Sequence, residues 1–199
     1  QNIHLEGIRS FMNTGNGFVL QQAQNVDAYR CVTDQNEDWG VSASLASIRW
    51  ENGVAYSNRS GGFRLANTTL ELMNSIVHVF HPTSFVYQLN QASAVGSDYN
   101  YFWLSTNANI ARDDRLKFNY INLSEWQSEE GADIHSVMGD PLMANPGSGD
   151  FSLRSQVGRF TPNGTFVSFD TTNSWAIDAG NPTNLFNRET SPNGARINM

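Results

Sequence analysis

Apolar residues recur along this chain at a nearly constant interval of 22 or 23 residues. One column and the set that follows it two positions later are Ile3, Val26, Ile48 and Leu70, then Leu5, Ala28, Trp50 and Leu72. Two further columns are Phe18, Val41, Phe63 and Phe85, with Leu20, Ala43, Leu65 and Tyr87 two positions later, and Ile8, Cys31, Val54 and Val77. A fixed period of this length is typical of solenoids, in which each repeat packs against its neighbours.

The spacing of two residues within each column predicts short strands with one buried face. Helical repeats would show apolar residues three and four positions apart over longer stretches, so they are excluded. The predicted fold is all-β: a single-stranded right-handed parallel β-helix with about 22 to 23 residues per coil. We expect one continuous domain, with coils over residues 1–122 and a C-terminal segment over 123–199. That segment is predicted to hold irregular closing turns and a short helix, from a capping box at Ser124 and Gln127 to a position near Gly131.

Asparagines form a further column at the predicted turns, at Asn13, Asn36 and Asn58. Their amides can bond to the turn backbone and they tolerate left-handed conformations, so we interpret this column as a structural ladder. Asn58 also begins one of four N-x-S/T sequons.

Composition argues against several classes of partner. The chain has 12 lysines and arginines against 19 aspartates and glutamates, a formal net charge of -7, so it lacks the clustered cations that duplex nucleic acid requires. No run of 18 apolar residues is present, and no membrane span is expected. Cys31 is the single cysteine, which excludes an intramolecular disulfide, and the spacings of Asp133, His135 and Asp140 match no known metal motif. We therefore expect no metal site.

The C-terminal segment carries three motifs that resemble those of a known superfamily. They are a turn at Asp140-Pro141-Leu142-Met143, a strand at Gly149-Asp150-Phe151-Ser152-Leu153, and the sequence Trp175-Ala176-Ile177-Asp178-Ala179-Gly180-Asn181-Pro182. Similar motifs recur near the end of the solenoid in bacterial right-handed β-helix repeat proteins of the pectin-lyase-like superfamily. Members of that group usually have a capping helix before the first coil and a further strand after the last one. On this resemblance the chain is expected to be a fragment of a longer protein, or to have its ends covered by a partner.

The resemblance implies an extracellular or cell-surface, carbohydrate-associated domain of a bacterial protein. Such a domain would bind polysaccharide or be a degenerate form of a polysaccharide-active enzyme. One alternative is a structural stalk, adhesin or filament component that self-associates through exposed solenoid ends. A second alternative is an active polysaccharide lyase or glycoside hydrolase. No cofactor is expected, except Ca²⁺ if the chain is a lyase, and the sequence assigns no catalytic residue.

Four charged residues share one outward position on successive coils: His4, Asp27, Arg49 and Glu71. Glycoside hydrolysis needs two carboxylates, and those of Asp27 and Glu71, two coils apart, are predicted to lie about 9.6 Å from each other. Arg49 between them would lower both pKa values, whereas the catalytic acid needs a raised one. A solvated charge ladder is the favoured interpretation, and substrate binding is the alternative.

Two other groups are candidates for binding a glycan. Arg64, on another outward row, could bind a uronate, although no acidic cluster accompanies it there. Tyr99, Tyr101 and Trp103 are predicted to share one strand face, which either stacks on sugar rings or is buried in the protein.

Overall fold

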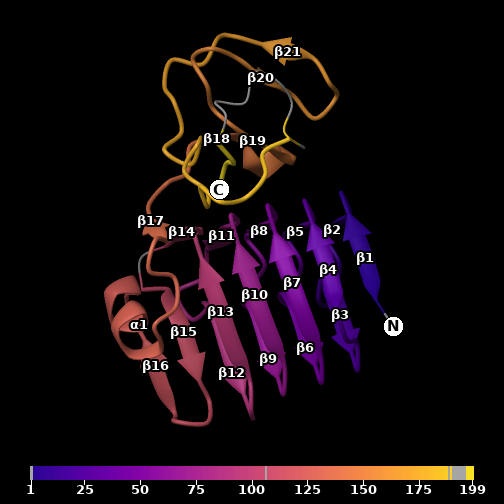
Figure 1. Cartoon of the computed structure of the whole chain (residues 1–199), viewed down its shortest axis with the longest axis vertical. Helices are drawn as coiled ribbons and strands as arrows, with labels where there is room; N and C mark the ends of the chain where they lie inside the picture. Colours follow the sequence, from indigo (N-terminus) through magenta and orange to yellow (C-terminus); the bar gives the residue numbers. More distant parts are fainter. Residues whose placement is uncertain (1, 106, 188, 190–195) are drawn as a thin grey trace.

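The computed structural model describes residues 2–105, 107–187, 189 and 196–199. It confirms the all-β parallel β-helix, a solenoid of about five turns. Figure 1 shows the coils side by side from β1 toward the helix α1, with the C-terminal part of the chain along one side.

Three sheets run the length of the solenoid, and each of the first four coils contributes one parallel strand to each sheet. At the end of sheet C, β16 pairs antiparallel with β15. Sheet A contains β1 (Ile3–Glu6), β4 (Val26–Tyr29), β7 (Ser47–Glu51), β10 (Thr69–Met73) and β13 (Ala94–Asp98). Sheet B contains β2 (Arg9–Phe11), β5 (Val32–Asp34), β8 (Val54–Tyr56), β11 (Ile76–Val79), β14 (Tyr101–Leu104) and β17 (Val137–Met138). Sheet C contains β3 (Phe18–Gln21), β6 (Trp39–Ser44), β9 (Gly61–Ala66), β12 (Phe85–Asn90), β15 (Asn109–Asp113) and β16 (Phe118–Tyr120).

The predicted columns of sheet A are confirmed residue by residue. Ile3 pairs with Val26, Val26 with Ile48, and Ile48 with Leu70. The set two positions later is paired in the same way, and Trp50 in that set is 1% exposed.

The predicted register of sheet C is wrong at its fourth strand. Phe63 pairs with Tyr87, not with Phe85, so the interval there is 24 residues. Tyr87 is nine residues after His78, whereas Phe63 is seven residues after Tyr56, because the turn that contains Pro82 is longer. A shift of two residues keeps the same side chains facing inward, so alternation could not reveal it. The outward row that includes Arg64 therefore continues to Gln88. The predicted pairing of Phe63 with Phe85 would have continued this row to Val86.

The third predicted column, in sheet B, is wrong by one residue. Val54 pairs with Val32 and Ile76, which places it on the outer face, whereas Cys31 and Val77 face the core. A slip of one residue exchanges the two faces of a strand. The sequence could not show the slip because apolar residues such as Val54 and Val77 occur on both faces of sheet B.

An aromatic stack follows the solenoid axis through the main core. The ring of Trp50 makes edge contacts at 5.6 Å with those of Phe18 and Phe63, and Tyr87 continues the stack to Trp126 at 5.3 Å. Burying a large apolar side chain contributes roughly 1.5 to 3 kcal/mol, so this stack is a main source of stability.

The asparagine ladder is present at the turns between sheets B and C. Asn13 Nδ2 donates to Asn36 Oδ1 and Asn36 Nδ2 to Asn58 Oδ1, both at 2.8 Å. Asn58 Nδ2 donates to the carbonyl oxygen of Thr33 at 2.9 Å. Asn58 is 1% exposed, so this sequon is closed to glycosylation in the folded protein.

The helix α1 (Leu123–Glu130) covers the end of the solenoid beside β15. The predicted short helix is present, but its N-cap is Asn122, whose side chain accepts the N–H of Glu125, and not Ser124. Gly131 ends the helix at a φ of 65°, a conformation that glycine adopts without strain. Among the described residues, β1, β2 and β3 are the edge strands at the first coil, and β13, β17 and β16 are the edge strands at the other end.

Buried Asp133 holds this cap in place. Its carboxylate accepts hydrogen bonds from Trp126 Nε1 at 3.0 Å, from Asn100 Nδ2 at 3.0 Å and from three hydroxyl groups. Burial raises the pKa of Asp133, and these donors act in the opposite direction. We assign Asp133 a structural role because these hydrogen bonds, all from groups of the protein, join its carboxylate to α1 and to the last coils.

The C-terminal segment lies along the outer face of sheet B (Figure 1). It contains β18 (Met143–Asn145), the 3-10 helix η1 (Pro146–Ser148), β19 (Asp150–Leu153), β20 (Arg159–Phe160) and β21 (Phe166–Val167). A second apolar cluster joins this segment to the sheet; its members include Ile76, Tyr101, Met143, Ala176 and Met199. Asn74 Oδ1 also accepts the N–H of Asn181 at 2.7 Å.

Candidate functional site

The predicted charged row lies together on the outer face of sheet A. His4 pairs with Asp27, Asp27 with Arg49, and Arg49 with Glu71, and the four line a shallow groove of about 440 Å³. The register therefore agrees with the sequence analysis. Whether these residues bind a substrate stays a prediction.

Most charges in this row are already paired within the protein. The ring nitrogens of His4 lie 3.1 Å from Asp27 Oδ2 and 3.3 Å from Glu6 Oε2, and hydrogen bonds to Glu6 and Asp27 raise the pKa of His4. Arg49 forms an ion pair at 2.8 Å with Glu51, which is not a member of this row. This arrangement resembles a solvated charge ladder more than a preorganised site.

The other predicted binding residues are spread over different faces. Arg64 is exposed on the outer face of sheet C, next to Ser42 and Gln88. Tyr99 precedes β14 and stacks on His135 at 4.6 Å. Tyr101 is 5% exposed beneath the C-terminal segment.

Trp103 belongs to a row of rings on the outer face of sheet B. His78 lies between Tyr56 and Trp103, with ring centroids 4.6 Å and 4.3 Å apart. Burial lowers the pKa of His78 to about 4, and the more distant Asp140 carboxylate opposes this shift. His78 is therefore neutral at pH 7. Because these rings stack on one another and face the C-terminal segment, the arrangement favours packing, and sugar binding by Trp103 stays a prediction.

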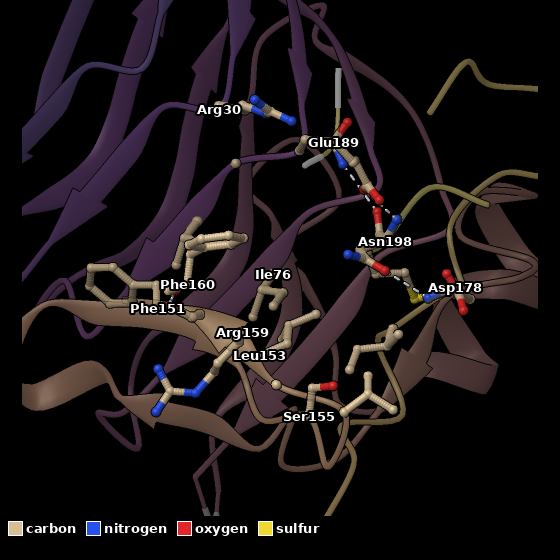
Figure 2. A pocket seen from close by; sticks show the side chains of 18 of the residues that line it. Arg30, Ile76, Phe151, Leu153, Ser155, Arg159, Phe160, Asp178, Glu189 and Asn198 are labelled. Atoms are coloured by element: carbon tan, nitrogen blue, oxygen red, sulfur yellow. Dashed lines mark hydrogen bonds between the residues drawn. The ribbon is translucent and has the colours of Figure 1, made fainter. Parts of the chain in front are cut away.

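A larger pocket, of about 600 Å³, opens between the C-terminal segment and the solenoid. We call it the flank pocket; Figure 2 shows it from close by. Its solenoid side comes from Arg30, Asn52, Gly53 and Ile76. Its other side comes from β19, β20 and β21 and from Ile177, Asp178, Glu189, Asn198 and Met199. A Cβ atom at Gly53 would lie 2.1 Å from Trp50 Nε1, so a glycine is required at this part of the wall.

One side of the flank pocket is aromatic. Phe151, Phe160 and Phe166 line it, and the rings of Phe160 and Phe166 meet edge to face at 5.3 Å. Phe160 is 43% exposed and Phe166 is 48% exposed. These rings therefore offer accessible apolar surface beside the pocket.

The other side is polar, and Asn198 organises it. Asn198 Oδ1 accepts the N–H of Asp178 at 2.7 Å, and the N–H of Asn198 donates to Glu189 Oε1 at 2.8 Å. Asn52 Nδ2 donates to the carbonyl oxygen of Asn198 at 3.0 Å. Figure 2 shows Glu189, Asn198 and Asp178 on the side opposite Phe151 and Phe160.

Asn52 Oδ1 and Asp178 Oδ1, on the polar side of the flank pocket, accept no hydrogen bond from the described residues although they are closed to solvent. A buried acceptor without a donor costs roughly 1 to 3 kcal/mol. Burial raises the pKa of Glu189, and the charge of Asp178 acts in the same direction; the N–H of Asn198 and the charge of Arg30 oppose them.

The sequence analysis did not identify the flank pocket. Its residues come from 30–76 and from 151–199, and nothing in their spacing shows that they meet. Two signals were present: the apolar outward residues of sheet B, such as Val54 and Ile76, and the motif that contains Asp178. Among the described residues, no cluster of three or more His, Cys, Asp or Glu side chains could hold a metal ion. Within the same residues, no helix is long and apolar enough to cross a membrane.

Fold and site together define a parallel β-solenoid with a ligand-sized pocket on its flank. Comparisons with family models, curated proteins and solved structures find nothing that matches this chain.

Proposed function

We propose that this chain is a carbohydrate-binding domain and that the flank pocket is its binding site. The observation that carries the proposal is the pocket's two-sided chemistry, with rings on one wall and amide and carboxylate groups on the other. The volume of about 600 Å³ falls in the usual range for small-molecule sites, roughly 300 to 1,000 Å³. An extracellular setting in a bacterial secreted or surface protein belongs to the same proposal, on the resemblance of the C-terminal motifs.

A sugar fits this chemistry because each ring has apolar C–H faces and a rim of hydroxyl groups. Aromatic rings pack against the C–H faces, while paired oxygen and N–H groups bind the hydroxyls. Phe160 and Phe166 can supply the first contact, and Asn52 and Asp178 the second. The charged groove on sheet A offers hydrogen-bonding groups but no phenylalanine, tyrosine or tryptophan ring among its described lining residues.

Glycoside hydrolysis is a second candidate, favoured by the raised pKa of Glu189 beside the Asp178 carboxylate. The catalytic acid of a glycoside hydrolase is a carboxyl group whose pKa is raised by its surroundings, and a second carboxyl group lies nearby. Release of reducing sugar that is lost in a Glu189→Gln variant would establish catalysis. Binding without product release would restrict the protein to recognition.

Calorimetric titration with oligosaccharides tests the binding proposal. Phe160→Ala removes part of the aromatic wall and is expected to weaken binding about tenfold, in line with the roughly 0.5 to 1.5 kcal/mol of an aromatic contact. Phe80→Ala is the matched control, because Phe80 is 64% exposed and does not line the pocket. Equal losses in both variants, or no binding of neutral, acidic or basic oligosaccharides at millimolar concentration, would contradict the proposal.

A further inference from the structure

Most charged side chains that line the flank pocket are already occupied within the protein. Arg159 forms ion pairs with Asp150 at 3.0 Å and with Asp170 at 2.8 Å, and its side chain is only 10% exposed. Arg30 and Glu189 also interact with other groups of the protein. The charges of these three lining residues are therefore not free for a ligand.

Asn198 brings a hydrogen-bond donor to the polar wall, across the pocket from Phe160 (Figure 2). Its Oδ1 accepts the N–H of Asp178, its N–H donates to Glu189, and its carbonyl oxygen accepts from Asn52. Among the described residues, Asn198 Nδ2 has no hydrogen-bond partner, and it is not closed to solvent. Because Oδ1 and Nδ2 leave the same carbon atom in different directions, Nδ2 stays available to an acceptor of a ligand.

Asp178 supplies an acceptor next to this donor. Its Oδ1 is closed to solvent, which leaves Oδ2 as the carboxylate oxygen that a ligand can contact. Asp178 and Asn198 are joined by the hydrogen bond of 2.7 Å, so the donor and the acceptor belong to neighbouring groups. A ligand must pair with both. A carboxylate offers acceptors only and a protonated amine offers donors only, so each of them satisfies one of the two.

The accessible apolar surface of the pocket is not limited to the rings of Phe160 and Phe166. Val157 lines the pocket together with these rings and is 75% exposed. A sugar hydroxyl that faces such a surface loses water without gaining a partner, whereas a methyl group gains by leaving water. A ligand that fits therefore brings an apolar substituent in addition to the C–H face of its ring.

We infer that the ligand of the flank pocket is an N-acetylated amino sugar. The inference rests on the proposed carbohydrate site and names the class of sugar. The acetamido carbonyl oxygen accepts from Asn198 Nδ2, and a ring hydroxyl donates to Asp178 Oδ2. The acetamido methyl group packs against Val157, while the C–H face of the ring packs against Phe160 and Phe166.

Three β-1,4-linked trisaccharides that differ only at C2 test the inference when each is titrated calorimetrically into the whole chain at pH 6. They are the trimers of N-acetylglucosamine, of glucosamine and of glucose. The N-acetylated trimer is expected to bind at least tenfold more tightly than the other two, because it alone brings both the carbonyl oxygen and the methyl group.

Two results would overturn the inference and leave the carbohydrate site standing. One is equal or tighter binding of the glucosamine or the glucose trimer. The other is no binding of the N-acetylated trimer while another neutral, acidic or basic oligosaccharide binds. Failure of every oligosaccharide overturns the carbohydrate site itself.

Asn198→Asp is the decisive variant, because it removes the Nδ2 donor and keeps an oxygen for the N–H of Asp178. The readout is the affinity ratio of the N-acetylglucosamine and glucose trimers, which are both neutral, so the added charge acts on them equally. This ratio should fall at least fivefold. Asn163→Asp adds the same charge at an exposed turn that does not line the pocket, and it should keep the ratio. An unchanged ratio in Asn198→Asp would refute the inference.

Val157→Thr keeps the inference testable if thermal unfolding shows that Asn198→Asp does not fold. Val157 is 75% exposed, and threonine has nearly the same shape, so the fold is expected to survive. Replacing one methyl group by a hydroxyl should lower the same affinity ratio about twofold or more. A ratio that stays at the wild-type value would contradict the packing of the acetamido methyl group against this wall.

Discussion

The outer faces of sheets A and B belong to the same coils but meet different surroundings. On sheet A the outward residues include His4, Asp27, Arg49 and Glu71, and they face solvent over a shallow groove. On sheet B the outward residues include Val32, Val54 and Ile76. Val54 and Ile76 pack beneath the C-terminal segment and line the flank pocket. The comparison teaches that the inward residues build the solenoid, whereas the outward residues decide which flank is covered. The flank pocket exists because sheet B is covered.

The two faces are expected to differ most in how much stability is lost when an ion pair on each of them is broken. On sheet B, Arg9 binds the carboxylate of Asp34 through two hydrogen bonds of 2.8 Å, and the Asp34 side chain is 0% exposed. Arg9→Met is expected to lower the free energy of unfolding by about 3 kcal/mol, because it leaves a buried charge without a partner. On sheet A, His4→Gln breaks an exposed pair and should leave that free energy unchanged. Denaturant unfolding measures both, and equal effects would contradict the comparison.

Two histidines sharpen the comparison through pH. Burial lowers the pKa of His78 on sheet B to about 4, whereas carboxylate partners raise that of His4 on sheet A. His78 is neutral in the folded protein, while the unfolded chain takes up its proton near pH 6.5. The stability from His78 is therefore complete above pH 6.5 and falls by about 3 kcal/mol as the pH drops to 4.

The variant His78→Phe keeps a ring between Tyr56 and Trp103 and cannot titrate. As the pH falls from 6.5 to 4, the free energy of unfolding of the variant should rise relative to that of the wild type, because only the wild type loses the contribution of a neutral His78. A difference that stays constant over this range would mean that His78 is not buried as a neutral ring.

The smallest effect is expected from Glu71 on sheet A. Glu71→Gln should change the free energy of unfolding by no more than about 0.5 kcal/mol, as is usual for exposed positions. Oligosaccharide affinity should also stay unchanged. A clear loss of affinity in this variant would transfer the binding site from the flank pocket to the groove on sheet A.

Much of the solenoid could be predicted from the sequence because stacking repeats the same inward residues at the same interval. The first four strands of sheet A were predicted in the correct register for this reason. In sheet C the longer turn around Pro82 added two residues, and Phe85 took the place of Tyr87 in the prediction because both are aromatic. In sheet B apolar residues occupy both faces, so alternation could not place Val54.

The candidate site was harder to predict than the fold. A local motif indicated that Asp178 belongs to a closing turn, but its approach to Asn52 depends on how the C-terminal segment packs across sheet B. Contacts between segments more than 100 residues apart leave no periodic signal. The charged row on sheet A was visible in the sequence because it repeats at one position of successive coils. In the structure, His4 and Arg49 of this row form ion pairs with neighbouring carboxylates.

The most direct test is a titration of the ¹⁵N-labelled chain with an oligosaccharide that it binds in calorimetry, followed by amide chemical shifts. The account predicts that the largest shifts occur at Asn52, Asp178 and Asn198 in the flank pocket, while those of Asp27 and Arg49 on sheet A stay in place. Large shifts along the sheet A row, with none in the flank pocket, would contradict it.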